Sequence, residues 1–271
     1  TGEYLADEVG ICNHLNSCGY HYSPKDYFRD NNIHLQNDTT KPHAKLRPVP
    51  RQQSKTTFPK FIPSKIFLKT LTHYESNNLI TYLKTIFDEE TVSHLINIYK
   101  IGTSRHFHKG TTIFWQIDTQ GSIRTGKLIK YNPQTGKRIK EPFTATTWAH
   151  TLLYKDGYRL SQCLFGEHLL KEVPDYPVAI VESEKTAVIA QAKMPAYIWL
   201  ATGSLTEFKP AKLNILKNRK VVAFPDLGAF DRWQQKASAL DFKITVSDYL
   251  EKNATEEQRK QGLDIADFLC R

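Results

Sequence analysis

The sequence has no apolar run of eighteen residues, the length that a helix needs to cross a membrane. It has no signal-peptide pattern at its beginning, and its four cysteines are too scattered to form a disulfide framework. The phosphate-binding Gly-x-x-x-x-Gly-Lys-Ser/Thr loop and the Gly-x-Ser-x-Gly elbow are also absent. These absences exclude a membrane span and a helicase motor within this chain, and they indicate a protein of the reducing cytoplasm.

Positive charge is in excess. The 271 residues include 37 Lys and Arg against 28 Asp and Glu, which gives a formal net charge of +9. Hydrophobic residues make up 40% and charged residues 24%, as is typical of a globular protein with room for two domains. The basic excess favours a polyanionic partner, and nucleic acid is the first candidate.

The stretch 177–187 is the one around which the chain is organised. Its first part is apolar and predicts a short buried strand, and Glu182 follows where that strand ends. Ser183 and Glu184 then begin a helix, because a small polar cap followed by an acid suits a helix N-terminus. We expect Glu184 and Lys185 to lie on the solvated first turn of this helix.

A second strand-to-helix corner spans 221–231, where an apolar run ends at Asp226 and Gly228 follows. Further strands are predicted at 197–201 and 242–246, with helical patterns between them. This alternation predicts an α/β domain with a parallel sheet and flanking helices. Ligands bind at the carboxyl ends of the strands in such sheets, so the carboxylate after the first strand is predicted to lie at a functional edge.

The region upstream predicts a smaller α+β domain. Helical spacing begins after Ser76 and again after Asp88, and strands follow at 111–118 and 123–131. Aromatic residues alternate there with basic ones, which are Arg124, Lys127, Lys130, Lys137 and Arg138. This composition suits a groove for a single nucleic-acid strand, where bases stack and phosphates pair. The alternative is that the aromatic rings are core and the basic side chains merely face water.

The first 74 residues carry two further features. Cys12 and Cys18 resemble half of a zinc site, but structural zinc needs four ligands. Either His14 and His21 complete the Zn²⁺ site, or, as we favour, the missing knuckle lies upstream of the first residue. Residues 39–74 hold eight Lys or Arg, no acid and several prolines, so they predict an extended basic linker. This linker is either a strap along a phosphate backbone or a solvated tether.

Three motifs in order resemble the TOPRIM domain of primases and topoisomerases, in the form found on phages and plasmids. They are Val-Glu-x-Glu-Lys-x-Ala from Val181, an apolar strand followed by Asp-x-Gly-Ala at Asp226, and Gly-Leu-Asp-Ile-Ala-Asp from Gly262. The resemblance covers 174–271 well and the upstream part more loosely. This chain departs from the family pattern twice, because Ser183 replaces a glycine and Gly228 replaces the second acid of Asp-x-Asp.

The resemblance implies a site for Mg²⁺ or Mn²⁺. In the family, the first Glu acts in acid–base chemistry or metal binding, which here falls on Glu182, and the Asp-x-Asp pair holds magnesium. Asp226 would then hold the metal with Asp231, or with Asp264 and Asp267, while Lys185 would contact phosphate. The alternatives remain open: Asp231 is favourable near a helix start through the dipole alone, and Asp264 and Asp267 cap the last helix.

The predicted chain has four parts: a partial zinc-ribbon-like segment (1–38), the basic linker (39–62), an α+β accessory-like domain (63–172) and a TOPRIM-like domain (173–271). The predicted function is primase-like, metal-dependent nucleotidyl transfer in plasmid or phage DNA replication. Its partners would be DNA, single-stranded by preference, and a helicase or another replication protein. One alternative is a DNA-binding replication or mobilisation protein that has lost its chemistry, in which Asp231 would be turned away, and the other is a TOPRIM nuclease.

Overall fold

The structure is a computed structural model of the chain, and it describes residues 6, 9–11, 21–31, 58, 60–141, 145–154 and 157–270. Two units are present, Thr1–Lys55 and Thr56–Arg271. No helix among the described residues is both long and apolar enough to cross a membrane.

The described residues of the first unit form a short antiparallel pair and the helix α2. Strands β1 (Gly10–Ile11) and β2 (His21–Tyr22) pair in register, and α2 (Pro24–Asp30) begins after Ser23, whose side chain accepts a hydrogen bond from the Asp26 amide. The predicted zinc ligands Cys12, His14 and Cys18, the side chain of His21 and most of the predicted linker lie outside the described residues.

Helices open the second unit. They are α3 (Ser64–Leu68), the 3₁₀ turn η1 (Tyr74–Ser76), α4 (Asn78–Leu83) and α5 (Glu89–Tyr99). Asp88 is the N-cap of α5, where its side chain accepts a hydrogen bond from the Thr91 amide at 2.7 Å, and the apolar face of this helix is buried. The N-cap of α4 is Asn77, whose side chain accepts from the first helical amides.

An antiparallel sheet follows. Its strands are β3 (Gly102–Ser104), β4 (Thr111–Ile117), β5 (Ile123–Ile129) and β6 (Thr146–Trp148), in that spatial order. The two long strands were predicted, and both are confirmed. Gly126 is required on β5, since a Cβ there would lie 2.6 Å from the ring of Trp115 on β4. Both faces of β4 are therefore closely packed.

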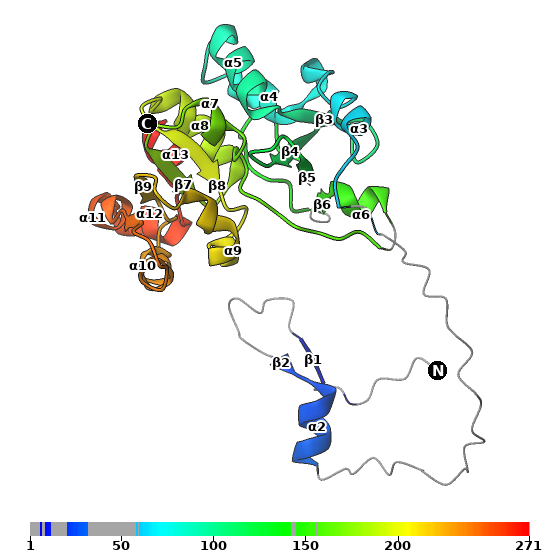
Figure 1. Cartoon of the computed structure of the whole chain (residues 1–271), viewed down its shortest axis with the longest axis vertical. Helices are drawn as coiled ribbons and strands as arrows, with labels where there is room; N and C mark the ends of the chain where they lie inside the picture. The colour runs from blue at the N-terminus through cyan, green and yellow to red at the C-terminus, as the bar shows by residue number, and fades with distance from the viewer. Residues whose placement is uncertain are drawn as a thin grey trace, which may run out of the picture. The chain divides into compact units, whose positions relative to one another are not determined.

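The parallel sheet contains β7 (Val178–Val181), β8 (Ile198–Ala201), β9 (Val221–Ala223) and β10 (Thr245–Val246), in the order β8-β7-β9-β10. All three pairings are parallel, so the predicted α/β fold class is confirmed. The other helical segments are α6 (Ala149–Leu153), α7 (Leu169–Glu172), α8 (Glu184–Lys193), η2 (Leu205–Glu207), α9 (Pro210–Leu213), η3 (Asn214–Leu216), α10 (Phe230–Ser238), α11 (Tyr249–Asn253), α12 (Glu256–Gln261) and α13 (Ile265–Leu269). Figure 1 shows α8 and α13 on one side of this sheet and α9 and α10 on the other.

The strand order places a topological switch point between β7 and β9. From β7 the chain runs through α8 to β8 on one side, and it then crosses to β9 on the other side. The connections therefore diverge at the carboxyl ends of β7 and β9, and this divergence opens a crevice in doubly wound sheets. The two predicted corners, at Glu182 and Asp226, both lie at this edge.

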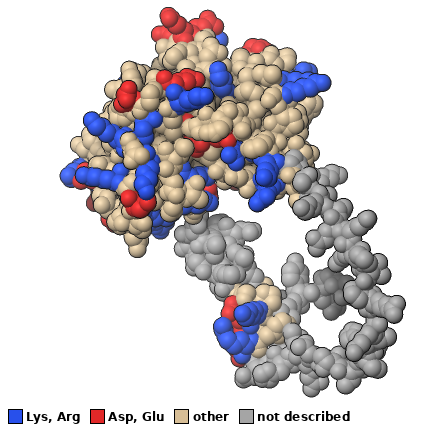
Figure 2. Space-filling view, in the orientation of Figure 1, with Lys and Arg blue, Asp and Glu red and all other residues tan. Residues whose placement is uncertain are grey.

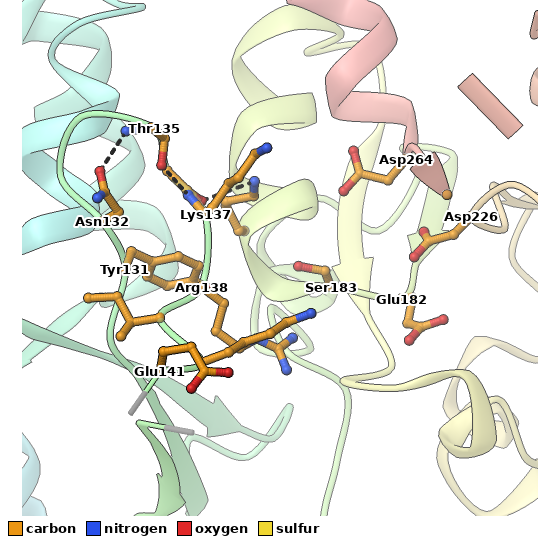
Figure 3. A pocket seen from close by; sticks show the side chains of 15 residues that line it. Tyr131, Asn132, Thr135, Lys137, Arg138, Glu141, Glu182, Ser183, Asp226 and Asp264 are labelled. Carbon is orange, nitrogen blue, oxygen red and sulfur yellow. Dashed lines mark hydrogen bonds between the residues drawn. The ribbon is translucent and has the colours of Figure 1, made fainter. Parts of the chain in front are cut away.

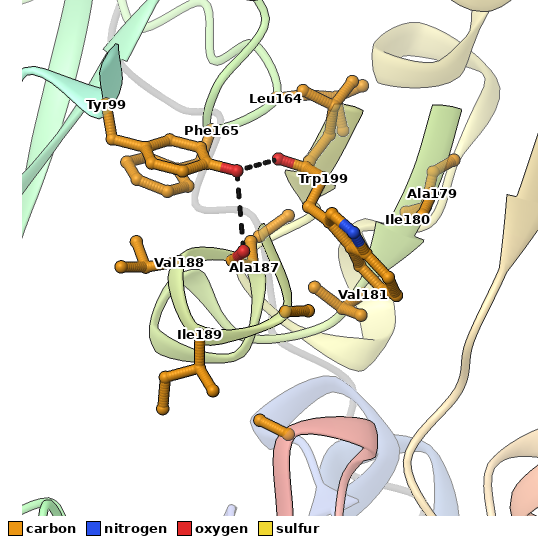
Figure 4. Packing of buried hydrophobic residues seen from close by; sticks show 14 of the residues in the cluster. Tyr99, Leu164, Phe165, Ala179, Ile180, Val181, Ala187, Val188, Ile189 and Trp199 are labelled. Atoms are coloured by element: carbon orange, nitrogen blue, oxygen red, sulfur yellow. Dashed lines mark hydrogen bonds between the residues drawn. The ribbon is translucent and has the colours of Figure 1, made fainter. Parts of the chain in front are cut away.

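The two sheets share one hydrophobic core. Tyr99 of α5 is fully buried, stacks on Phe165 with ring centroids 5.0 Å apart, and donates its hydroxyl hydrogen to the Trp199 carbonyl of β8 at 2.8 Å. The Ala187 carbonyl of α8 lies within hydrogen-bonding distance of the same hydroxyl (Figure 4). Residues on both sides of the predicted boundary between 172 and 173 contribute to this core.

Candidate metal and nucleotide site

A cleft of about 770 Å³, here called the main cleft, opens at the switch point. Its lining residues come from a hairpin after β5, from the first turn of α8 and from the loops before α10 and α13: Tyr131, Asn132, Thr135–Glu141, Glu182, Ser183, Lys185, Asp226, Gly262 and Asp264. Figure 3 shows hairpin side chains on one side and the carboxylates of Glu182, Asp226 and Asp264 on the other. The cleft therefore has a basic wall facing an acidic wall.

Asp226 is the carboxylate with the least satisfied surroundings. Its Oδ1 atom is buried and has no hydrogen-bond partner among the described residues. Burial, followed by the nearby charges of Glu182, Asp264 and Asp267, raises the pKa of Asp226 to about 8, and Lys185 opposes this shift. A carboxyl group in this state is protonated at neutral pH unless a cation joins it.

Glu182 follows β7 directly, as predicted. Burial raises the pKa of this carboxyl group, while a hydrogen bond from the Leu205 amide and the charges of Lys127 and Arg138 act in the opposite direction. The backbone carbonyl of Glu182 accepts from the Gly203 amide at 2.9 Å, which ties the end of β7 to the end of β8. The carboxylate is thus held at the edge where the two strands stop.

Asp264 and Asp267 cap the last helix, which is the alternative that the sequence left open for them. The Asp264 side chain accepts from the Asp267 amide, and the Asp267 side chain accepts from the Asp264 amide. The second oxygen of Asp264 accepts from the Thr186 hydroxyl on α8, which draws α13 towards the acidic wall. Burial and the charge of Asp267 raise the pKa of Asp264. Asp264 lines the main cleft. Asp267 does not line it and acts on the carboxylates there through its charge.

Asp231 is not brought to this cluster. It lies exposed in the first turn of α10 and does not line the main cleft. Gly228, which stands where the family has a second acid, has φ of +83° and donates its amide hydrogen to Glu251. The third carboxylate of the acidic wall therefore comes from Asp264 and not from Asp231.

The basic wall is an ordered hairpin. The amide of Asn132 donates to the Lys137 carbonyl, and a Cβ on Gly136 would lie 2.4 Å from the Tyr82 ring, so this turn packs closely on α4. Lys185 of α8 donates to the Gly136 carbonyl at 3.3 Å. Lys137 and Arg138 of the predicted basic set are exposed here, and so is the neighbouring Lys140.

The remaining predicted basic residues lie elsewhere. Arg124 forms an ion pair with buried Asp118 at 2.6 Å. Lys130 is half-buried just after β5, where the backbone leads into the hairpin. Lys127 is buried and pairs with Glu184 at 3.1 Å. On the face shown in Figure 2, Lys and Arg side chains are spread over several parts of the second unit.

The expectation that Glu184 lies on a solvated helix turn is wrong. Glu184 is 1% exposed, because α8 packs its first turn against β5 and meets the Lys127 ammonium there. No signal in the sequence sets Lys127 apart, because Arg124 on the same strand and Lys130 just after it are basic as well.

A second hollow of about 370 Å³, here called the side pocket, lies beside the main cleft and shares Glu182 and Arg138 with it. Sequence reasoning missed it. Its lining residues come from the ends of the two sheets: Lys127, Arg138, Trp148, Gln162, Glu182, Thr202, Gly203, Ser204, Glu207 and Lys212.

The donor chemistry of the acidic wall fits a hard divalent cation. Among the described residues, no three His, Cys, Asp or Glu side chains are already arranged to hold a metal ion. Magnesium is commonly bound through one or two carboxylates together with water and substrate phosphates, so a preformed cage is not required. The buried, unpartnered Oδ1 of Asp226 and the neighbouring Glu182 provide this kind of open site.

Fold and cleft together define an α/β protein in which an antiparallel four-stranded sheet is followed by a parallel four-stranded sheet with flanking helices, with an acidic crevice at the switch point. The chain belongs to the family described as a domain of unknown function (DUF6371), whose model matches residues 77–227. A zinc β-ribbon finger model matches residues 1–33, in agreement with the ribbon predicted for this segment. No curated protein matches the sequence.

Solved primase structures are distantly similar. The primase fragment of the bacteriophage T7 primase-helicase is 13% identical, with a TM-score of 0.39 over 62% of this chain and 69% of that chain. The DnaG catalytic core is 10% identical, with a TM-score of 0.46 over 76% of this chain and 80% of that chain. A primase domain from Pseudomonas aeruginosa is 11% identical, with a TM-score of 0.36 over 71% and 65% of the two chains.

Proposed function

We propose that the main cleft carries out metal-dependent nucleotidyl transfer on nucleic acid, as a primase does. One observation carries this proposal. Asp226 presents a buried and unpartnered oxygen, beside Glu182 and Asp264, directly opposite a hairpin of exposed basic side chains. An acidic wall suits divalent cations, and a basic wall suits the phosphates that those cations accompany.

Each wall has its own task in this proposal. Asp226 and Glu182 would hold Mg²⁺ or Mn²⁺, which when bound neutralises charge on a reacting phosphate. Lys137 and Arg138 would bind the phosphates of the incoming strand or nucleotide. Glu182, whose pKa is raised by burial, would hold or release a proton beside the attacking hydroxyl. Asp264 would keep α13 in place through the Thr186 hydroxyl.

Nucleic acid is the proposed substrate class because of the net charge of +9 and the sequence resemblance to TOPRIM primases. We extend the proposal to single-stranded DNA as template and to plasmid or phage replication as the setting. A helicase or another replication protein would then be the natural partner. Zinc binding at Cys12 and Cys18 remains a prediction.

Calorimetry with Mn²⁺, in the presence of single-stranded DNA, tests the metal site. We expect the wild type to bind and Asp226→Asn to lose binding by at least about 100-fold, since the loss of even an outer-shell partner of a metal ligand costs about 10- to 100-fold in affinity. Asp231→Asn is the matched control, because the same substitution there falls on an exposed side chain outside the cleft. Primer synthesis should likewise be lost in Asp226→Asn and retained in the wild type and in Asp231→Asn. Binding that survives in Asp226→Asn would overturn the proposal.

A second function is favoured by a different observation. Gly228 replaces an acid, Asp231 is turned away from the cleft, and the described residues hold no preformed metal cluster. These features suit a DNA-binding replication protein without chemistry. DNA binding that is unaffected by Mn²⁺, EDTA and Asp226→Asn would establish this alternative, whereas strand cleavage without primer synthesis would identify a nuclease.

A further inference from the structure

The side pocket contains polar groups that the fold itself does not use. Lys212 and Glu207 satisfy each other at 2.8 Å, and Lys212 also donates to the Thr202 carbonyl at 3.0 Å. In contrast, the side chains of Arg138 and Gln162 make no hydrogen bond or ion pair with the described residues, although both line the pocket. Their hydrogen-bonding capacity is available to a ligand.

Trp148 gives the pocket an aromatic surface. The chain has four tryptophans, and the other three, Trp115, Trp199 and Trp233, are at most 1% exposed. Trp148 is only half-buried, and its indole lies at the end of β6 with no hydrogen bond to the described residues. Partly exposed aromatic rings beside basic residues are the surfaces on which nucleobases stack.

Lys127 supplies a fixed positive charge at the same pocket. Its ammonium donates to Glu184 at 3.1 Å and to the Gly203 carbonyl at 2.6 Å, and it lies 6.0 Å from the centre of the Trp148 ring. A lysine ammonium has three hydrogens, so one remains after these two bonds. Gly203 permits the arrangement, because a Cβ there would lie 3.1 Å from the Glu184 carboxylate.

A buried ion pair is by itself weak evidence of a role in folding stability. Replacing a buried pair by well-packed apolar residues is often neutral or stabilising, because both charges must leave water. The pair therefore calls for another explanation, and its place at the pocket wall supplies one: Glu184 and Gly203 hold the Lys127 ammonium in one position, next to Arg138 and Glu182.

We propose that the side pocket, formed where β5, β6 and the end of β8 meet, is a nucleotide-binding subsite. Trp148 stacks on the base, the Gln162 amide hydrogen-bonds to the edge of the base, and Arg138 and Lys127 bind the phosphates. Glu182 and Arg138 line both hollows, so the phosphates of a nucleotide seated here point to the acidic wall. The proposal deepens the proposed function, on which it rests for the nature of the reaction.

Calorimetry in EDTA tests the subsite without any contribution from a metal. The probes are the four ribonucleoside triphosphates, inorganic triphosphate and the corresponding nucleosides. We expect the best-binding nucleotide to lose about 5- to 150-fold in affinity in Trp148→Ala, the range of a lost base stack. Affinity for inorganic triphosphate should stay unchanged in this variant and fall in Arg138→Ala.

Two variants serve as matched controls. Tyr176→Ala removes an exposed aromatic ring that lines neither hollow, and Arg232→Ala removes an exposed guanidinium on α10. Neither should change the affinity for any probe. If Trp148→Ala is folded by circular dichroism and binds the nucleotide as tightly as the wild type does, the proposal is overturned.

Tryptophan fluorescence provides an independent measurement. Because the other three indoles are buried, a nucleotide should quench Trp148 alone, and the quench should disappear in Trp148→Phe. The outcomes separate the two proposals. Nucleotide binding lost in Trp148→Ala, with no metal binding by Asp226, would leave the subsite standing and remove the catalytic proposal; the reverse pattern would remove the subsite alone.

Discussion

Asp118 and Asp226 both follow buried strands, yet their surroundings differ completely. Asp118 closes the turn between β4 and β5, where its oxygens accept from the Gln120 and Ser122 amides and from the Arg124 guanidinium. Asp226 closes the corner after β9 and has a buried oxygen with no partner among the described residues. A satisfied carboxylate indicates a structural role, whereas an unsatisfied one needs a ligand to explain it.

The first way to sharpen this comparison is the same substitution at both positions. Asp118→Asn should lower the free energy of unfolding by about 1.5–3 kcal/mol, since it weakens a hydrogen bond between charged groups. Asp226→Asn should raise it at pH 7, because the wild-type carboxyl group, with a pKa of about 8, must take up a proton on folding and the amide need not. Urea denaturation in EDTA measures both values. A larger loss at Asp226 than at Asp118 would reverse the roles assigned to them.

The second way uses pH. The pKa of Asp226 is raised to about 8 in the folded protein, mainly by burial, while an unfolded Asp titrates near about 4. Between these values the folded state binds a proton that the unfolded state has released. This group's contribution to stability is therefore complete below about pH 4 and is lost as the pH rises towards 8.

The measurement is the urea midpoint between pH 5 and pH 8, for the wild type and for Asp226→Asn, without metal. Glu182 and Asp264 also have raised pKa values and give slopes of the same sign, so only the difference between the two proteins reports on Asp226. We expect the wild type to lose more stability than the variant across this range. Parallel curves would mean that Asp226 is ionised in the folded protein.

The smallest expected effect concerns Gly228, the position at which this chain departs from the TOPRIM pattern that it resembles. Nothing lies within 4 Å of a Cβ built there, but φ of +83° disfavours side chains. Gly228→Asp should cost about 1–2 kcal/mol of stability through this backbone strain. It should also raise Mn²⁺ affinity, because it adds a carboxylate next to Asp226. Gly228→Ala carries the same strain without the charge, and an equal Mn²⁺ affinity in both variants would exclude position 228 as a metal ligand.

Much of the fold could be predicted from the sequence because its signals are local. Apolar runs followed by acids identified β7 and β9, and the alternation with helices indicated their parallel pairing. The predicted strand over 242–246 is shortened to β10, which pairs with β9 through only two residues. The resemblance offered Asp231 and Asp264 as alternatives beside Asp226, and the packing of α13 against α8 brings Asp264 there.

The candidate site was less predictable for the same reason. Burial of Lys127 and Glu184 results from the contact of two sheets that are far apart in sequence. Trp148 and Gln162 reach the side pocket from segments without any motif, so no local pattern marks them as ligand-binding residues. Sequence spacing identified the strand ends, and tertiary packing selected which side chains meet there.

The hydroxyl of Tyr99 has a consequence for how this chain unfolds and how it can be divided. It joins α5 to the carbonyl of Trp199, in the middle of a core to which both sheets contribute. Separating the sheets would leave that carbonyl without its donor and expose the Phe165 ring that stacks on Tyr99. We therefore expect that the parallel sheet cannot be excised as a module, because both sheets contribute to one core and the cleft is lined from both of them.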